Sequence, residues 1–490
     1  MKKLVSILCA AALVLSLAAC GAESQSGGDE AKAAVYSLES ATTFTFSDSG
    51  ITAQDGSYTG YEIDGTTLTI DGAGAYVVTG ACADGSIQIK KGTTGVTLAL
   101  NGLALTSADT APILCGKSTE VVIVAADGST NSLTDAAENN DDSYPDNTEA
   151  ENAVIKCKDG AQMTLCGGGA LTINANGKNG IKSGASTTEE GEASLTIREL
   201  TLNIEALVND AINAEQRLKV ESGNLTIAAG EDAIHCDMEL NIGAEGTTGP
   251  AITVSTCGEG LEGAVLNIYS GNMDITSTDD CLNAANSDLG DYAFEMNISG
   301  GTIKAYSSGG DGFDSNGTLT ITGGDISVWT ASTADNQPLD ADGRITISGG
   351  TVLAAGGSAG MGFSISASQP YVTFGGGRDS SLSLAGGEAF SIADESGKSV
   401  LDSTALCNAA FLFYSSPALM AEGRYSVQST VTATAKTGEA DTRFGGNGGP
   451  GGSSGQRPDG MTPPDGAPSD GQPPQSDGTT PPELPAASSN

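Results

Sequence analysis

The fold is decided by a four-residue motif that recurs as Asn179-Gly180-Ile181-Lys182, Asp210-Ala211-Ile212-Asn213, Asp232-Ala233-Ile234-His235, Glu259-Gly260-Leu261-Glu262, Asp280-Cys281-Leu282-Asn283, Asp311-Gly312-Phe313-Asp314 and Gln337-Pro338-Leu339-Asp340. Each copy has an acid or amide, a small residue, an apolar anchor and a polar residue. The anchors lie 21 to 31 residues apart. Repeats of this length are typical of stacked supersecondary units, none of which buries its apolar face alone.

Two short runs of alternating apolar and polar residues lie between successive motifs. One example is the run 266–268, the small-residue turn 270–272 and the run 273–275. Period-two alternation indicates half-buried strands, and no stretch between the motifs is long enough and periodic enough to be a crossover helix. We therefore predict an all-β parallel β-helix. Each repeat has three short strands, and each strand pairs with its equivalent about 4.8 Å along the axis.

The rest of the chain is organised around this stack. A solenoid needs a cap over its first core layer, and the Gly/Pro-rich end has almost nothing to bury. The predicted divisions are a lipoprotein signal peptide (1–19), a flexible tether (20–34), an N-terminal β cap (35–95), the parallel β-helix (96–400), a small C-terminal β cap (401–444) and a disordered tail (445–490). Within the helix, Phe363 and Phe390 mark weak continuations of the repeat.

The N-terminus has the features of a bacterial lipoprotein. Lys2 and Lys3 precede an apolar run, 4–17, that is too short to span a bilayer. The following Leu-Ala-Ala-Cys matches a lipoprotein box and predicts acylation of Cys20. We therefore expect an extracytoplasmic protein, lipid-anchored to the bacterial membrane or cell surface. An ordinary cleaved signal peptide is the alternative.

Composition restricts the partners. The 61 acidic and 21 basic residues give a net charge of −40, which repels nucleic acid and anionic lipid. Cations and neutral or cation-bridged ligands remain as partners of a chain that we expect to be monomeric. Apart from Cys9 and Cys20, eight cysteines remain, and their spacing has no CxxC metal signature. We expect them to be buried thiols and assign no disulfides.

Acids fill two columns of the aligned motifs. Two carboxylates about 4.8 Å apart repel by roughly 1 kcal/mol in water and about 3.5 kcal/mol at an effective dielectric of 20. A stack of acids is therefore costly unless a cation lies among them, and Ca²⁺ suits loose sets of carboxylate, amide and carbonyl oxygens. The predicted Ca²⁺ ligands are Asp210, Asp232, Glu259, Asp279, Asp280, Asp311 and Asp314. The alternative is a set of acids that splay apart into solvent.

A third column predicts a sugar-binding surface. When the turns of successive repeats are aligned, Tyr306 and Trp329 share an outward position on adjacent repeats, with Lys304 two residues earlier. Exposed aromatic rings offer a large contact area with few rotors to freeze, which suits the faces of sugar rings. We predict that these three residues bind ligand. The alternative is that another segment covers them.

A further column has a structural role, and the sequence contains no recognisable catalytic set. Asn241, Asn267 and Asn297 align between inward aliphatic residues, where asparagine ladders stabilise stacked strands. His235 is the single histidine of the chain, and no nucleophile–base set can be assembled around it. We therefore name no catalytic residue.

Four stretches carry a family resemblance: Gly-Ala-Tyr-Val-Val-Thr-Gly at 74–80, Val-Thr-Leu-Ala-Leu-Asn-Gly at 96–102, Asn-Gly-Ile-Lys-Ser at 179–183 and the later Asp-Ala-Ile and Asp-Gly-Phe motifs. Together with the lipoprotein box, they resemble bacterial carbohydrate-binding domain-containing surface proteins over roughly 35–427. The resemblance implies a right-handed parallel β-helix akin to polysaccharide lyases. It also implies calcium in the solenoid and binding of cellulose and acidic, pectin-like polysaccharides, without established cleavage.

Three functions are consistent with these observations. The first is a lipid-anchored, calcium-stabilised protein that binds polysaccharide without cutting it. The second is a calcium-dependent uronate lyase, which would need an arginine or lysine base. The third is a surface adhesin or structural spacer for protein partners.

Overall fold

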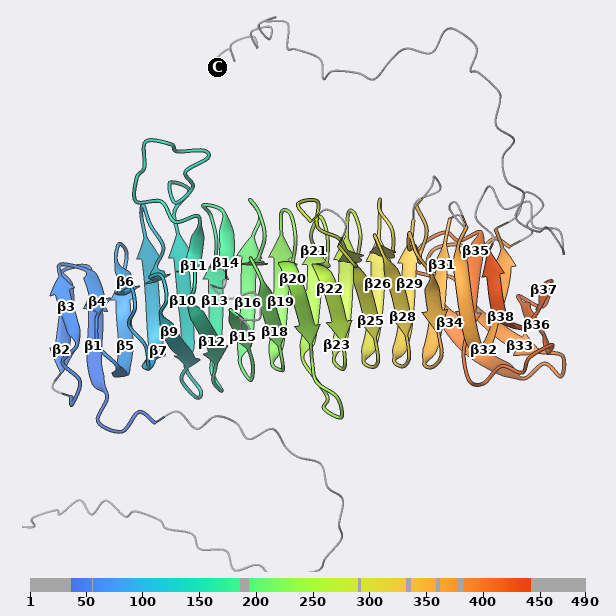
Figure 1. Ribbon diagram of the computed structural model, residues 1–490, viewed down its shortest axis with the longest axis horizontal. Coiled ribbons are helices and arrows are strands. Elements are labelled where there is room, and N and C mark those ends of the chain that lie inside the picture. Colours follow the sequence, from blue (N-terminus) through green and yellow to red (C-terminus); the bar gives the residue numbers. More distant parts are fainter. Residues whose placement is uncertain are drawn as a thin grey trace, which may run out of the picture. The chain divides into compact units, whose positions relative to one another are not determined.

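The computed structural model describes residues 37–54, 56–185, 194–289, 292–331, 336–357, 362–376 and 382–441. Every regular element in these ranges is a β-strand (Figure 1). The described part contains no helix of the length and apolarity that a membrane crossing requires. The predicted signal peptide, the Cys20 acylation site, the tether and the C-terminal tail lie outside the described residues.

Most strands belong to one large sheet whose pairing is mainly parallel, and they fall into three rows. The ladder row carries the motif anchors. It contains β4 (Thr67–Ile70), β6 (Ser86–Ile89), β8 (Ile113–Cys115), β11 (Ala153–Cys157), β14 (Asn179–Ser183), β17 (Ile212–Ala214), the first halves of β20 (Ile234–Ile242) and β22 (Leu261–Ile268), β24 (Leu282–Ala284) and β27 (Phe313–Ser315).

The other two rows are formed by the alternating runs between the motifs. The second row contains β9 (Glu120–Ala125), β12 (Gln162–Cys166), β15 (Leu195–Ile197), β18 (Arg217–Val220), the second halves of β20 and β22, β25 (Glu295–Ile298), β28 (Thr318–Ile321), β30 (Ile345–Ile347) and β32 (Ser364–Gly375). The third row contains β10 (Thr130–Asp135), β13 (Ala170–Asn174), β16 (Thr201–Ala206), β19 (Asn224–Ala229), β21 (Ala251–Thr256), β23 (Asn272–Ser277), β26 (Thr302–Ser307), β29 (Asp325–Thr330) and β31 (Thr351–Gly356). The long strand β7 (Val96–Ser107) pairs with β9 of the second row and with β10 of the third row, and β5 (Gly74–Cys82) pairs with β7.

The motif anchors form one continuous interior line, as predicted. Ile212 pairs with Ile234, Ile234 with Leu261 and Leu261 with Leu282, and all four side chains are fully buried. Removing an aliphatic side chain of this size from water contributes about 1.5–3 kcal/mol. The anchors therefore supply a repeated stabilising contact along the stack.

The small second residue of the motif has a steric cause. A Cβ atom on Gly260 would lie 2.2 Å from the carbonyl oxygen of Cys281, and one on Gly312 would lie 2.4 Å from the carbonyl oxygen of Pro338. Each contact is with the same motif one repeat later, because the backbone amide of each anchor donates to that carbonyl. The close approach of successive repeats thus limits the residue before the anchor to a small one.

The ends of the stack are antiparallel. At the N-terminus, β1 (Thr42–Ser47) pairs with β2 (Gly50–Gln54), and β3 (Tyr61–Asp64) pairs with β4. Parallel pairing already begins between β1 and β5, before residue 96. At the C-terminus, β35 (Phe411–Ser415) pairs antiparallel with both β31 and β32, and β38 (Lys436–Asp441) pairs with β32.

A separate four-stranded antiparallel sheet contains β33 (Ala389–Asp394), β34 (Ser399–Thr404), β36 (Arg424–Val427) and β37 (Val431–Thr434). Phe390 lies in β33, so its prediction as an anchor of a further stacked repeat is wrong. Period-two alternation marks any half-buried strand and does not distinguish parallel from antiparallel pairing.

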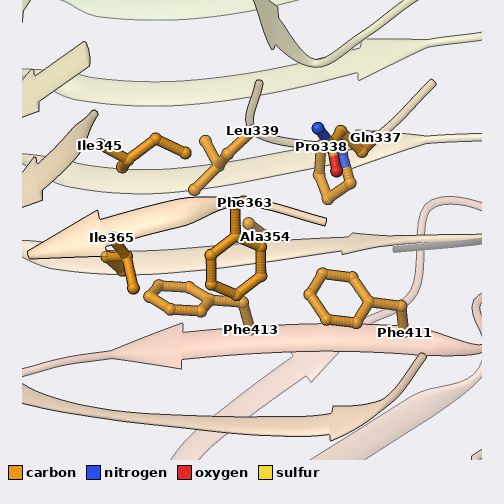
Figure 2. Close-up of a pocket in the computed structure, with 9 residues that line it drawn as sticks. All are labelled: Gln337, Pro338, Leu339, Ile345, Ala354, Phe363, Ile365, Phe411 and Phe413. Atoms are coloured by element: carbon orange, nitrogen blue, oxygen red, sulfur yellow. The ribbon is translucent and has the colours of Figure 1, made fainter. Parts of the chain in front are cut away.

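Aromatic side chains close the C-terminal end of the core. Phe363, Phe411 and Phe413 gather beside Ile365 and Leu339 (Figure 2). They leave a cavity of about 10 Å³, which holds one water molecule at most. This cavity is a packing gap in the core rather than a ligand site.

Candidate functional site

The functional candidates lie on the outward side of the ladder row. The residue after each anchor stacks on its equivalent one repeat away, because the anchors point inward and neighbouring side chains of a strand point to opposite faces. We call this line the polar row. Its members are Lys156, Lys182, Asn213, His235, Glu262, Asn283 and Asp314, in paired register.

His235 is held by three carboxylates. Its Nδ1 lies 2.6 Å from Glu262 Oε2 and 3.1 Å from Asp232 Oδ2, and its Nε2 lies 2.9 Å from Asp237 Oδ1. Burial lowers the pKa of His235, but the hydrogen bonds to the three acids outweigh it and raise the pKa well above its usual value. The imidazolium therefore acts as a built-in cation within this part of the row.

Two predicted ligands are engaged by groups of the chain itself. Asp210 is 4% exposed, and it accepts hydrogen bonds from the Asp232 backbone amide at 3.0 Å and from Asn213 Nδ2 at 2.6 Å. Asp232 contacts His235, and burial raises its pKa to about 6. These two carboxylates are already compensated by protein donors, so they are weaker cation ligands than the sequence predicts.

A second group of acids has no such cation among the residues that the structure describes. One carboxylate oxygen each of Asp311, Asp314 and Asp340 lies within 4.8 Å of the others. Burial, together with the charge of the neighbouring Asp340, raises the pKa of Asp311 to about 7 and that of Asp314 to about 6. The sequence prediction missed Asp340 as a ligand, although it occupies the last position of the motif.

Two more predicted ligands lie next to this group along the stack. Burial raises the pKa of Asp280 to about 8 and that of Glu259 to about 7. Asp280 accepts a hydrogen bond from the Asp311 backbone amide at 2.6 Å, and Glu259 accepts one from Asn283 Nδ2 at 2.8 Å. Asp279 precedes Asp280, and its side chain is exposed. The structure thus brings together Glu259, Asp280, Asp311, Asp314 and Asp340 over three successive repeats and the following motif.

Two buried amide oxygens near these acids have no hydrogen-bond donor among the residues that the structure describes. They are Asn283 Oδ1, in a side chain 7% exposed, and Gln337 Oε1, in a side chain 2% exposed. An unsatisfied buried acceptor costs about 1–3 kcal/mol. Asn283 lies between Glu262 and Asp314 on the polar row. A cation beside it would satisfy the amide oxygen and offset the repulsion between the acids.

The donor set fits a hard divalent cation. All of the candidate groups are carboxylate or amide oxygens, which Ca²⁺ takes six to eight at a time in flexible geometry. Asp311, Asp314 and Asp340 provide three carboxylates within one small volume. Asp232, His235 and Glu262 also lie within 4.8 Å of one another, but the imidazolium occupies the space between the two acids.

The predicted exposed aromatic surface is wrong. Tyr306 and Trp329 do pair in register on adjacent third-row strands, but Trp329 is fully buried. Its ring lies 6.1 Å from that of Phe390, edge to face, in a cluster formed with the C-terminal antiparallel sheet. A segment more than fifty residues later in the chain covers the ring, and no local pattern around Trp329 reveals that cover.

The other two predicted ligand-binding residues remain at the surface. Lys304 is exposed and pairs with Asp274 at 3.0 Å. Tyr306 is half-buried and lines a hollow of about 680 Å³ together with residues of the segments 383–386 and 406–410. Neither residue lies on the polar row.

Two structural predictions are confirmed. Asn267 Nδ2 donates to Asn241 Oδ1, and Asn297 Nδ2 donates to Asn267 Oδ1, both at 3.1 Å. The cysteines are buried and free, as expected: Cys82, Cys115, Cys157, Cys166, Cys236, Cys257, Cys281 and Cys407. These residues stabilise the stack and do not contribute to the polar row.

The stacked, mainly parallel strands make this an all-β protein built from repeats, with a half-buried acidic row on one face. The family model of the carbohydrate-binding domain-containing proteins matches residues 64–360, which is more than half of the chain. The chain therefore belongs to this family.

Two known proteins are similar to parts of the chain. A carbohydrate-binding domain-containing protein of Acetivibrio thermocellus is 35% identical over 123 residues, which are 25% of this chain and 42% of the relative. The chain thus matches less than half of that relative's length. A solved structure of a polysaccharide lyase-like protein from C. thermocellum is 24% identical, with a TM-score of 0.33 over 64% of this chain and 93% of the other.

Proposed function

We propose that this protein binds polysaccharide at the cell surface through the polar row, that Ca²⁺ stabilises it, and that it does not cleave its ligand. The observation that carries the proposal is the group Asp311, Asp314 and Asp340, next to the orphaned amide oxygen of Asn283. Membership of a carbohydrate-binding family supplies the ligand class.

The proposed architecture is a right-handed parallel β-helix with a β cap at each end. The three rows of parallel strands support this, because each pairs a strand with its equivalent in the next repeat. Such a stack gives a long face with a regular spacing of about 4.8 Å. A polymer with many equivalent groups can contact several repeats of such a face at once.

In this proposal, Asp280, Asp311, Asp314 and Asp340 hold the ion with the amide oxygen of Asn283. Burial, and then repulsion from neighbouring acids, raises the pKa values of Asp280, Asp311 and Asp314, which marks the cost of keeping these carboxylates charged without a cation. A bound ion removes that cost and offers open coordination positions to hydroxyl or carboxylate oxygens of a ligand. Calcium thus supports both the stability of the row and the contact with polysaccharide.

The proposal includes a lipid anchor on Cys20. Acylation at this residue would hold the protein at the membrane surface, with residues 20–34 as a tether. A single acyl chain gives only reversible attachment, so stable anchoring needs more than one chain or a second signal. The polar row would then face polymers outside the cell.

The two lysines of the polar row lie too far from the proposed ion to act as the base of a lyase. In a lyase, the ion and the base act on the same sugar unit and lie within a few ångströms of it. Lys182 and Lys156 lie five and six repeats from Asp314, which corresponds to about 24 Å and 29 Å along the row. These lysines therefore do not serve as a base beside this ion.

The test is binding of the purified full chain to a glycan array, cellulose and polygalacturonate, with calcium or with chelator. We expect retention on at least one polysaccharide in calcium and release by chelator. Polygalacturonate incubated with the protein should give no unsaturated product absorbing near 235 nm. A blank array together with a co-purifying protein partner would favour the adhesin, and the absorbing product would favour the lyase.

A further inference from the structure

Two lysines are stacked on each other at the other end of the polar row. Lys156 and Lys182 are register partners on β11 and β14, and both side chains are half-buried. Neighbouring positions of a row are about 4.8 Å apart, a separation at which like charges repel by roughly 1 kcal/mol in water. Two stacked lysines without an acid between them are unexpected in a chain of net charge −40.

Four other described lysines have a carboxylate partner within 3.0 Å. These pairs join Lys117 to Asp159, Lys158 to Glu151, Lys178 to Asp142 and Lys304 to Asp274. Lys182 has a longer contact, 3.7 Å, with Glu215, similar to the 3.8 Å between Lys90 and Asp71. Lys156 has no ion pair with any residue that the structure describes. The stacked pair thus holds positive charge that the protein itself does not fully neutralise.

The surroundings of Lys156 add to this imbalance. Burial lowers the pKa of Lys156, and the neighbouring Lys182 lowers it further, while Glu215 and Glu151 act in the opposite direction. Glu151 is already paired with Lys158 at 2.6 Å, and Glu215 contacts Lys182. An added anion between the two ammonium groups would relieve the repulsion and compensate the partial desolvation of both.

We propose that Lys156 and Lys182 form an anion-binding subsite that takes a carboxylate or sulfate group carried on the polysaccharide. This inference rests on the proposed function, because it assigns a second contact to the same ligand. The two lysines offer up to six N–H donors, and hydrogen bonds between charged groups are about twice as strong as neutral ones.

The subsite is separate from the cation-binding acids. Five steps of the row separate Lys182 from Asp314, or about 24 Å. His235 and its acids lie between them. One extended polymer chain lying along the row would therefore meet lysines at one end and a bound cation at the other. An anionic group on the polymer can bind at both places, directly to lysine and through the ion to the acids.

The experiment compares three polymers by calorimetry in calcium: polygalacturonate, its methyl ester, in which the carboxylate is neutralised, and dextran sulfate. The variants of the full chain are Lys156→Met and Lys182→Met, singly and together. Lys219→Met is the matched control, because Lys219 is exposed on the second row in β18. Lys156→Arg with Lys182→Arg retains the charge and should rescue binding.

We expect wild-type protein to bind at least one anionic polymer more tightly than the ester. Each methionine substitution should weaken that binding about tenfold, the usual scale of one charge-assisted hydrogen bond. Binding of the ester should not change. Whichever of polygalacturonate and dextran sulfate shows the loss identifies the group bound. Melting temperatures of the variants show whether a methionine variant has lost its fold. In that case, the binding of the milder Lys182→Gln variant and of the arginine variant tests the subsite instead.

The outcomes separate this inference from the proposed function. If wild-type protein binds polysaccharide in calcium but the methionine variants bind the anionic polymers equally well, the subsite is refuted and the proposed function stands. Loss of ester binding to the same degree also refutes the subsite, because it shows a general effect. If wild-type protein binds no polysaccharide, both proposals fail.

Discussion

Replacing Asp314 with asparagine should have opposite effects without and with calcium. The carboxylate oxygens of Asp311 and Asp340 lie within 4.8 Å of that of Asp314. Each repulsion at this distance is about 1 kcal/mol in water and about 3.5 kcal/mol at an effective dielectric of 20. Removing one charge relieves two of them. Because the side chains are half-exposed and screened, we take the lower limit, a stabilisation of about 2 kcal/mol in chelator at pH 8.

The same change should remove much of the stabilisation by calcium. An ion present at 100 times its dissociation constant stabilises the folded protein by about 2.7 kcal/mol. For a chain of this length, 1 kcal/mol corresponds to roughly 1–2 °C in melting temperature, less than for smaller domains. We therefore expect calcium to raise the wild-type melting temperature by roughly 3–5 °C. In Asp314→Asn, the apo melting temperature should rise by roughly 2–4 °C and the response to calcium should largely disappear.

Thermal melts by circular dichroism, in chelator and in a calcium series, measure both effects. The matched control is Asp325→Asn, the same chemical change at an exposed position at the start of β29 on the third row. Asp325→Asn should leave the melting temperature unchanged both in chelator and in calcium. The reasoning is refuted if Asp314→Asn melts below wild type in chelator, or if calcium stabilises it as strongly as wild type.

Three further changes test other parts of the account. In chelator, stability should rise as pH falls from about 8 towards 5. The pKa values of Asp280, Glu259 and Asp311 in the folded protein, about 8, 7 and 7, exceed their usual 3.8, 4.5 and 3.8, so only the folded chain gains these protons. Urea unfolding at several pH values in this range measures the change in stability, and a stability that does not vary with pH would contradict the prediction. Trp329→Ala should cost about 3–5 kcal/mol from the lost core contacts and leave polysaccharide affinity unchanged; weaker binding by a fully folded variant would restore Trp329 as a ligand residue. Asn267→Ala should cost about 1–2 kcal/mol, because it breaks two side-chain hydrogen bonds of the asparagine ladder, and unaltered urea unfolding would show that the ladder adds nothing.

The stacking could be predicted from the sequence because it depends on periodic features. The anchors recur with a small residue before them, and the register of Ile212, Ile234, Leu261 and Leu282 follows from aligning the motifs alone. The same alignment placed Tyr306 beside Trp329 correctly. Equivalent positions in repeated units share neighbours, so the pattern itself defines these contacts.

The sequence did not predict which surface the C-terminal segment covers. Trp329 lies under the antiparallel sheet that contains Phe390, a contact between segments with no shared motif. Such contacts depend on the path of the chain after the repeats end, and amphipathic alternation does not encode that path. The division of the acidic row also depends on side-chain geometry. His235 neutralises one part of the row, whereas Asp311, Asp314 and Asp340 have no ion pair with a basic residue in the described part of the chain.

The most direct measurement is a calorimetric titration of Ca²⁺ into chelator-stripped wild-type protein and into a variant that combines Asp311→Asn with Asp314→Asn. The account predicts saturable calcium binding by wild-type protein and its loss in the variant, with Asp325→Asn binding like wild type. Wild-type protein that takes up no calcium, or a double variant that binds it as tightly as wild type, would contradict the assignment of the acidic row as the cation site.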